Sequence, residues 1–135
     1  MENIKEMEYV GRLETPIILA SDNYEGFNYY VISYGSHPCG YVEIPENHFL
    51  YEVDYDDICI HCHGGLTFSD KLMVKGIEGT YCIGWDYAHC NDYVYYGDDF
   101  NKYRNFGNKH TTEEIIAECK YVIEQIQEKG QTLLK

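Results

Sequence analysis

Two short stretches of the chain concentrate the side chains that could do chemistry. Ile58 to Ser69 reads ICIHCHGGLTFS and brings two histidines, two cysteines and a pair of glycines to the end of an apolar run. Tyr81 to Tyr93 reads YCIGWDYAHCNDY and adds a histidine, two more cysteines and two aspartates. These residue types serve as metal ligands, as acid–base catalysts or as polar contacts to a bound molecule.

The glycine pair of the first stretch favours a close approach to the backbone. Gly64 and Gly65 tolerate a positive φ and carry no side chain, so a ligand or another chain segment can lie against them. Thr67 and Ser69 are two residues apart and would present their hydroxyls on one face of an extended chain. The alternative is an ordinary turn in which His63 bonds a local carbonyl, and this stretch alone favours that alternative.

In the second stretch, Asp86, His89 and Asp92 follow the spacing D-x-x-H-x-x-D. Residues three apart share a face of a helical turn, so the three side chains could converge. An aspartate beside a histidine orients the ring and fixes its tautomer. The alternative is that Asp86 caps a turn and His89 is partly exposed. Taken together, the two stretches predict that His63, Asp86 and His89 line one pocket at one end of a sheet.

Composition narrows the class of protein. A chain of 135 residues fits a single domain, here 1–135, large enough to bury a core. The formal net charge of −13, with only ten lysines and arginines, repels nucleic acid duplexes and anionic membranes. The N-terminal segment lacks a secretory apolar region, and no run approaches the roughly 20 apolar residues that span a bilayer. We therefore expect a cytoplasmic protein whose six cysteines are free thiols.

Aromatic and β-branched runs predict the strands, and a capped apolar stripe predicts one helix. The expected strands are Asn28–Gly35, Gly40–Ile44, Ile58–Cys62 and Tyr81–Tyr87, and the expected loops are Pro45–Asp57 and Gly97–His110. Thr111 and Glu114 form a capping-box pattern, and Gly130 is a natural stop. Between them, apolar residues recur at helical spacing. The predicted fold class is α+β, a mostly antiparallel sheet with one long C-terminal helix packed on one face.

The motifs GYVEIP, HFLYEVDYDDI, HGGLTFS and GWDYAHCND occur in that order. In this respect the chain resembles a family of small proteins common in bacterial and phage genomes that share HGGLTFS and GxDxAHxxD. The resemblance covers Gly40 to Asp92 and Ala117 to Ile126. It implies that His63, Asp86, His89 and Asp92 belong to a signature, but it brings no established activity. His61 stands where other members tend to carry an acidic residue, which counts against it as a required ligand.

A metal site is one interpretation of these residues. Cys59 and Cys62 look like half of a zinc knuckle, but no second C-x-x-C or H-x-x-x-H pair exists. On a strand these two cysteines would also project from opposite faces, so we expect no structural zinc and no cofactor. A set of nitrogen and oxygen ligands remains open and would suit a metal-assisted hydrolase; its members are His63, Asp86, His89 and Asp92.

A binding site for a small nucleotide-derived molecule is the interpretation that we rank first. Fifteen tyrosines, several of them in expected loops, offer faces on which bases stack. We expect a tyrosine or Trp85 to stack on the base, and Asp86 or Asp92 to hold the ribose. Phosphate would sit near the backbone and hydroxyl donors of the first stretch. The complete predicted ligand-binding set is His63, Gly64, Gly65, Thr67, Ser69, Trp85, Asp86, His89 and Asp92.

The ligand class follows by analogy. Small phage-borne proteins that sequester nucleotide immune signals are similar in size and compartment, which suggests an ADP-ribose derivative or a cyclic nucleotide as ligand. The scarcity of arginine argues against this, because a diphosphate normally needs one. Metal-dependent hydrolysis of a nucleotide-like substrate ranks second. An acidic protein-interaction inhibitor that presents carboxylates and tyrosines ranks third, and self-association is left open.

Overall fold

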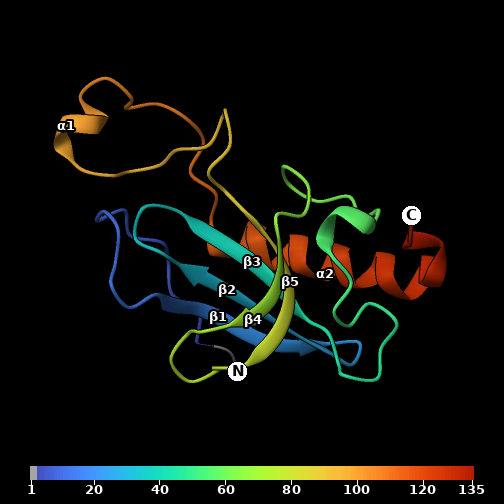
Figure 1. The fold of residues 1–135 in the computed structure, drawn as a ribbon. Helices are drawn as coiled ribbons and strands as arrows, with labels where there is room; N and C mark the ends of the chain where they lie inside the picture. The colour runs from blue at the N-terminus through green and yellow to red at the C-terminus, as the bar shows by residue number, and fades with distance from the viewer. Residues whose placement is uncertain (1–2) are drawn as a thin grey trace.

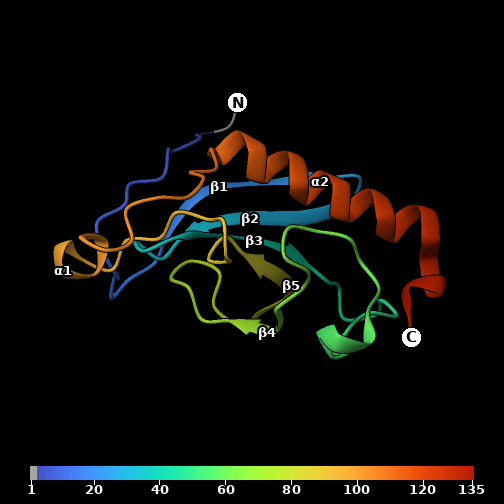
Figure 2. The ribbon, with the colours of Figure 1, turned by 90° about the horizontal axis from the view of Figure 1, so that it is seen from above.

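The computed structural model describes residues 3–135, which form an antiparallel sheet with a long helix along one of its faces (Figures 1 and 2). Within that range the sheet has five strands in the order β1-β2-β3-β5-β4. The strands are β1 (Ile17–Tyr24), β2 (Phe27–Ser33), β3 (Pro38–Glu43), β4 (Phe68–Leu72) and β5 (Thr80–Asp86). The helices are the 3-10 turns η1 (Tyr55–Asp57) and η2 (Gly130–Leu133), the short α1 (Asp98–Asn101) and the long α2 (Thr112–Lys129). The predicted α+β class, with one long C-terminal helix on one face, is confirmed.

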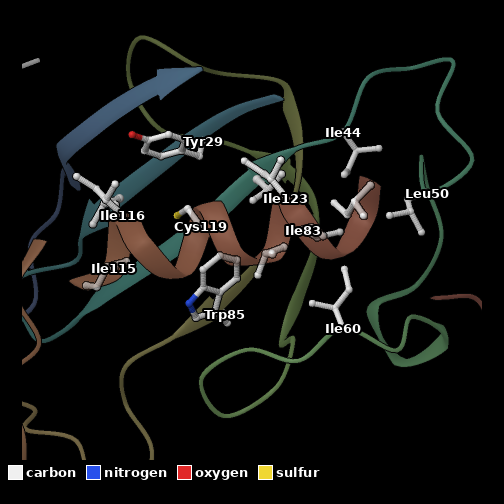
Figure 3. Close-up of a cluster of buried hydrophobic side chains, with 14 of the residues drawn as sticks. Tyr29, Ile44, Leu50, Ile60, Ile83, Trp85, Ile115, Ile116, Cys119 and Ile123 are labelled. Carbon is white, nitrogen blue, oxygen red and sulfur yellow. The ribbon is translucent and has the colours of Figure 1, made fainter. Parts of the chain in front are cut away.

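Helix α2 begins and ends where the sequence predicts. The Thr111 hydroxyl accepts from the Glu114 amide and the Glu114 carboxylate accepts from the Thr111 amide, which completes the capping box. The buried stripe of the helix contacts β1, β2 and β3. Figure 3 shows this core, in which Cys119 and Ile123 of α2 belong to the same buried cluster as Ile83 and Trp85 of β5. Burial of this stripe is what orders the helix, because an isolated helix of this length is marginal in water.

The strands alternate between two apolar faces. Tyr29 and Val31 of β2 point toward α2, whereas Tyr30 and Ile32 point to the opposite face. A second apolar cluster covers that opposite face; its buried members are Tyr30, Ile32, Cys39, Tyr41, Leu72, Val74 and Cys82. Because both faces are apolar, β2 and β3 read as continuous hydrophobic runs instead of alternating ones.

Two strands were not predicted, and both lie at the edges of the sheet. β1 ends in the polar sequence Ser-Asp-Asn-Tyr, and β4 contains Asp70 and Lys71 at exposed positions. An edge strand pairs on one side only and commonly carries charge, which protects it from pairing with other chains. Its sequence therefore shows a weaker strand pattern than that of a central strand.

The predicted strand Ile58–Cys62 is wrong, although its alternation is correct. Ile58 and Ile60 are buried while Cys59 and His61 are exposed, as the pattern indicates. Ile58 forms only an isolated bridge to Leu134. The Gln125 side chain of α2 bonds both backbone groups of His61, accepting from the amide at 2.8 Å and donating to the carbonyl at 2.7 Å. The segment is extended because its backbone bonds the Gln125 side chain and the C-terminal residues instead of a neighbouring strand.

We predict that Gln125→Ala destabilises the protein by about 1–3 kcal/mol, because it leaves polar backbone groups of His61 without their partner. Urea unfolding measures this change. Gln131→Ala is the matched control, since Gln131 is exposed in η2, and it should change the unfolding free energy by less than about 0.5 kcal/mol. Equal effects of the two substitutions would show that Gln125 does not anchor the segment that leads to His63.

Candidate functional site

Asp92 lies at the centre of a histidine cluster that follows the end of β5. Its carboxylate is only 2% exposed. Among the residues that the structure describes, three histidines contact it. His63 Nε2 lies 2.9 Å from Oδ1 and 2.8 Å from Oδ2, and His110 Nε2 lies 3.2 Å from Oδ1. The backbone amide of His89 donates to Oδ2 at 2.9 Å.

The Asp92 carboxylate is held in its ionised form. Burial acts to raise its pKa, but the hydrogen bonds from the His89 amide and from the rings of His63 and His110 outweigh burial and lower the pKa. A buried charge is tolerated only where donors surround it. The carboxylate therefore requires these three segments to stay together.

The ring of His89 lies directly on the backbone of Gly64. A Cβ atom at Gly64 would lie 2.4 Å from Cε1 of His89, and Gly64 has a φ of +69°. The close approach that the glycine pair predicts is thus made by another segment of the chain. His89 Nδ1 lies 3.2 Å from Asp86 Oδ1, but it is not aligned for a hydrogen bond, and within residues 3–135 this buried atom has no hydrogen-bond partner.

The end of β5 and helix α2 position the rings of the cluster. The His63 ring stacks on Tyr87 with its centroid at 4.4 Å and an interplanar angle of 16°. The amide of His63 donates to the Glu118 carboxylate of α2 at 2.8 Å. His110 directly precedes the N-cap of α2. The helix and the end of β5 therefore fix the cluster from two sides.

An aromatic pocket lies on the other side of Asp86 and has a volume of about 300 Å³. Its lining comes from β3, the start of β4, the end of β5 and segments outside the strands: Arg12, Tyr34, Ser36, His37, Cys39, Tyr41, Thr67, Phe68, Trp85, Asp86 and Tyr96. We refer to it below as the aromatic pocket.

Gly84 makes room for the aromatic floor of this pocket. A Cβ atom there would lie 2.4 Å from Cδ1 of Tyr41. The Tyr41 ring occupies this space and meets the ring of Phe68 edge to face at 5.4 Å. The hydroxyls of Tyr41 and Tyr34 are 2.7 Å apart and bond each other. The missing side chain in β5 thus lets rings from β3 and β4 pack together.

Arg12 is the positive group at the aromatic pocket. It is exposed, and within residues 3–135 its guanidinium has no hydrogen-bond or ion-pair partner. Burial lowers the pKa of His37; Asp86 opposes this effect and Arg12 adds to it. His37 is therefore neutral at pH 7, and the fixed positive charge at the pocket belongs to Arg12.

The structure distributes the predicted site residues over two neighbouring places. His63, Gly64, His89 and Asp92 gather in the histidine cluster, whereas Thr67, Trp85 and Asp86 line the aromatic pocket. Asp86 touches both, because its Oδ2 accepts from the Thr67 hydroxyl at 3.1 Å and its Oδ1 faces His89. Thus His63, Asp86 and His89 do lie close together, but of the three only Asp86 lines the aromatic pocket.

Two predicted residues belong to neither place. The Gly65 amide donates to the Cys62 carbonyl at 2.9 Å, and the Ser69 hydroxyl accepts from the Tyr55 amide at 2.9 Å. The amides of His63 and Thr67 are also used, the former by Glu118 and the latter by the Gly84 carbonyl. These internal bonds leave the expected phosphate cradle with few free donors.

Trp85 lies at the aromatic pocket but cannot offer a stacking face there. Its ring is buried between the sheet and α2, is 1% exposed, and donates from Nε1 to the Tyr87 hydroxyl (Figure 3). The rings of Tyr34, Phe68 and Tyr96 are more accessible.

Of the six cysteines, only Cys39 is among the residues that line the aromatic pocket. All six are free thiols within residues 3–135. Burial raises the pKa of Cys62 to about 12, and the nearby Glu118 acts in the same direction. Cys62 is therefore a neutral thiol at physiological pH, while Cys59 is exposed.

Four residues of the two places were not predicted as site residues: Arg12, Tyr34, His37 and His110. For Arg12 one signal existed, since it is one of only two arginines in an acidic chain. The others come from segments that carry no motif, and only the fold brings them to the site.

No protein family, curated protein or solved structure matches this chain. The family resemblance given by its motifs stays a prediction. Within residues 3–135, no helix has both the length and the apolar character needed to cross a membrane.

Gly64 and Gly65 offer a matched test of the contact with His89. Both have positive φ, so alanine at either position should cost about 1–2 kcal/mol of backbone strain. Only Gly64→Ala also collides with a ring, since a Cβ at Gly65 meets nothing within 4 Å. We expect Gly64→Ala to lower the melting temperature more than Gly65→Ala does, and to shift the ring signals of His89 in NMR spectra. Equal costs with unchanged His89 signals would contradict this packing.

Proposed function

We propose that the protein binds a small nucleotide-derived molecule in the aromatic pocket. The observation that carries this proposal is the combination of accessible aromatic rings, an unpaired arginine and a carboxylate around one cavity. Ligand pockets are typically lined by apolar and aromatic side chains with a few placed polar groups. This composition supports a nucleotide-like ligand over a purely apolar one.

Aromatic rings provide the contact for the base. Tyr34, Phe68 and Tyr96 border the cavity, and Tyr41 forms part of its floor. Stacking of a base on an aromatic side chain is worth about 1–3 kcal/mol and tolerates any base. The rings therefore supply affinity, while the polar groups supply orientation.

The polar groups suit a ribose and a phosphate. Asp86 Oδ2 accepts one hydrogen bond from Thr67 and has lone pairs left for ribose hydroxyls. Arg12 can hold phosphate oxygens with two parallel hydrogen bonds. This arginine answers the main objection to a phosphorylated ligand, because one of the two arginines of the chain is at the pocket.

The size of the cavity favours one nucleotide unit. Its volume of about 300 Å³ is at the lower end of the roughly 300–1,000 Å³ typical of ligand sites. An ADP-ribose derivative, entering with its adenosine or its terminal ribose, suits this space better than both halves of a cyclic dinucleotide.

We extend the proposal to sequestration in the cytoplasm of a bacterial or phage-infected cell, where the ligand would be an immune signal. One side chain of the pocket is excluded as a nucleophile that could attack the ligand. Burial raises the pKa of Cys39 to about 12, so its thiol is not an available nucleophile near neutral pH.

The direct test incubates the protein with ADP-ribose derivatives and cyclic nucleotides and follows the melting temperature. A ligand that binds only the folded state raises the melting temperature. At a ligand concentration of 100 times its Kd, the free energy of unfolding increases by about 2.7 kcal/mol. Heat denaturation and mass spectrometry of the supernatant then identify the released molecule. Intact ligand supports sequestration, whereas product supports the hydrolase alternative. If no panel member raises the melting temperature, nucleotide binding is wrong and the protein-contact alternative gains support.

Two exposed residues allow the pocket to be tested without disturbing the core. We predict that Arg12→Gln weakens binding of a phosphorylated ligand about 10- to 100-fold, as expected for a lost charged hydrogen bond. Tyr96→Ala should weaken it about 5- to 100-fold through lost stacking. The matched controls are Lys75→Gln and Tyr103→Ala, which change exposed residues outside the pocket. Calorimetric titration measures all four variants, and equal losses in the controls would contradict the assignment.

A further inference from the structure

We propose that His63, His89 and Asp92 bind one divalent transition-metal ion beside the aromatic pocket. A ring nitrogen of each histidine and an oxygen of the carboxylate lie within 4.8 Å of one another. This inference does not depend on the ligand proposed above, because no residue of this trio lines the aromatic pocket.

The distances suit a shared ion. Nitrogen and oxygen ligands lie about 2.0–2.2 Å from Zn²⁺, so ligand atoms of one tetrahedral site are about 3–4 Å apart. His63 Nε2 lies 2.8 Å from Asp92 Oδ2, and His89 Nδ1 lies 3.9 Å from the same oxygen. These separations are close to those around a shared ion, and binding would require His63 Nε2 to release the proton that it shares with Asp92.

The second observation is that His89 Nδ1 lacks a hydrogen-bond partner within residues 3–135. This nitrogen is buried and makes no hydrogen bond, although Asp86 and Asp92 are near. Leaving a buried polar atom unsatisfied is costly, and native structures rarely do so without a reason. A metal ion between Nδ1 and Asp92 would supply the missing partner.

Supporting contacts hold the three ligands in place. Gly64 lies under the His89 ring, and Tyr87 stacks on the His63 ring. The His110 ring bonds Asp92 Oδ1 at 3.2 Å. Metal sites typically have such outer contacts, which orient the ligands before the ion arrives. In this arrangement His110 is a positioning residue and not a ligand.

The donor set selects the class of metal. Two imidazole nitrogens and one carboxylate oxygen suit Zn²⁺, Co²⁺, Ni²⁺, Mn²⁺ or Fe²⁺, whereas Ca²⁺ and Mg²⁺ prefer sites made of oxygen alone. Three protein ligands leave coordination positions open for water or a bound molecule. The expectation of no zinc rested on the diverging Cys59 and Cys62 and on the lack of an evident four-ligand set, whereas the present site uses three protein ligands and neither cysteine.

Asp86 links this site to the aromatic pocket. One of its oxygens lies 3.2 Å from His89 Nδ1, and the other accepts from the Thr67 hydroxyl of the pocket lining. An ion held by the trio would therefore lie one side chain away from a ligand in the pocket. It would also offset part of the negative charge of Asp86 and Asp92.

The test uses the full chain without a histidine tag, stripped with a chelator. Titration with Zn²⁺ followed by calorimetry should give one ion per chain, and Co²⁺ should produce the visible absorption of a bound ion. His63→Ala and His89→Ala should each lower the Zn²⁺ affinity at least about 100-fold. His61→Ala is the matched control, since His61 is exposed and lies outside the trio, and it should bind as the unchanged protein does. His110→Ala should lower the affinity about 10- to 100-fold while keeping one ion per chain.

NMR spectra of the unchanged protein give a test that does not depend on any variant folding. Zn²⁺ should shift the ring nitrogen signals of His63 and His89 and leave those of His48 and His61 in place. The proposal is overturned if His61→Ala loses as much affinity as His63→Ala, if the ring signals of His63 and His89 do not move, or if no ion binds. Loss of the bound ion in His110→Ala would overturn the three-ligand assignment.

Discussion

The ionised carboxylate of Asp92 is the constraint that organises the functional end of this protein. A buried charge requires donors on all sides, and here they come from segments far apart in the sequence: His63 before β4, His89 after β5 and His110 before α2. Satisfying this single group ties three connections together. It also brings the ring of His89 onto Gly64, where only a glycine leaves enough space.

The end of β5 separates the site into two chemical environments. Beyond the strand, histidines and Asp92 form a compact polar cluster close to α2. On the face away from α2, Gly84 allows Tyr41 and Phe68 to pack into an aromatic floor. Asp86 is the last residue of β5 and contacts both environments. A change of charge in the histidine cluster would therefore change the electrostatic potential at the aromatic pocket. The two proposals are thus chemically linked, even though each is tested by itself.

Several features could be read correctly from local patterns. The capping box at Thr111 and the apolar stripe of α2 are properties of consecutive residues, and the helix has the predicted limits. The alternation from Ile58 to Cys62 correctly predicts which side chains are buried. It does not show whether the backbone pairs with a strand, and in the structure the His61 backbone bonds the Gln125 side chain. The edge strands β1 and β4 were not predicted, because they pair on one side only and carry polar residues.

By itself, the sequence determined the fold class, the helix and the central strands. These follow from hydrophobic periodicity. The contact of His63 with the end of β5 does not follow in this way, because no strand directly precedes His63. Tertiary structure alone decided that Arg12, Tyr34 and His110 join the site, and that Trp85 is buried in the core instead of facing a ligand. The physical reason is that such neighbours are set by packing between distant segments. The partners of a side chain in such a place depend on the space that the opposite segment leaves for it. Gly84, for example, leaves space for the Tyr41 ring.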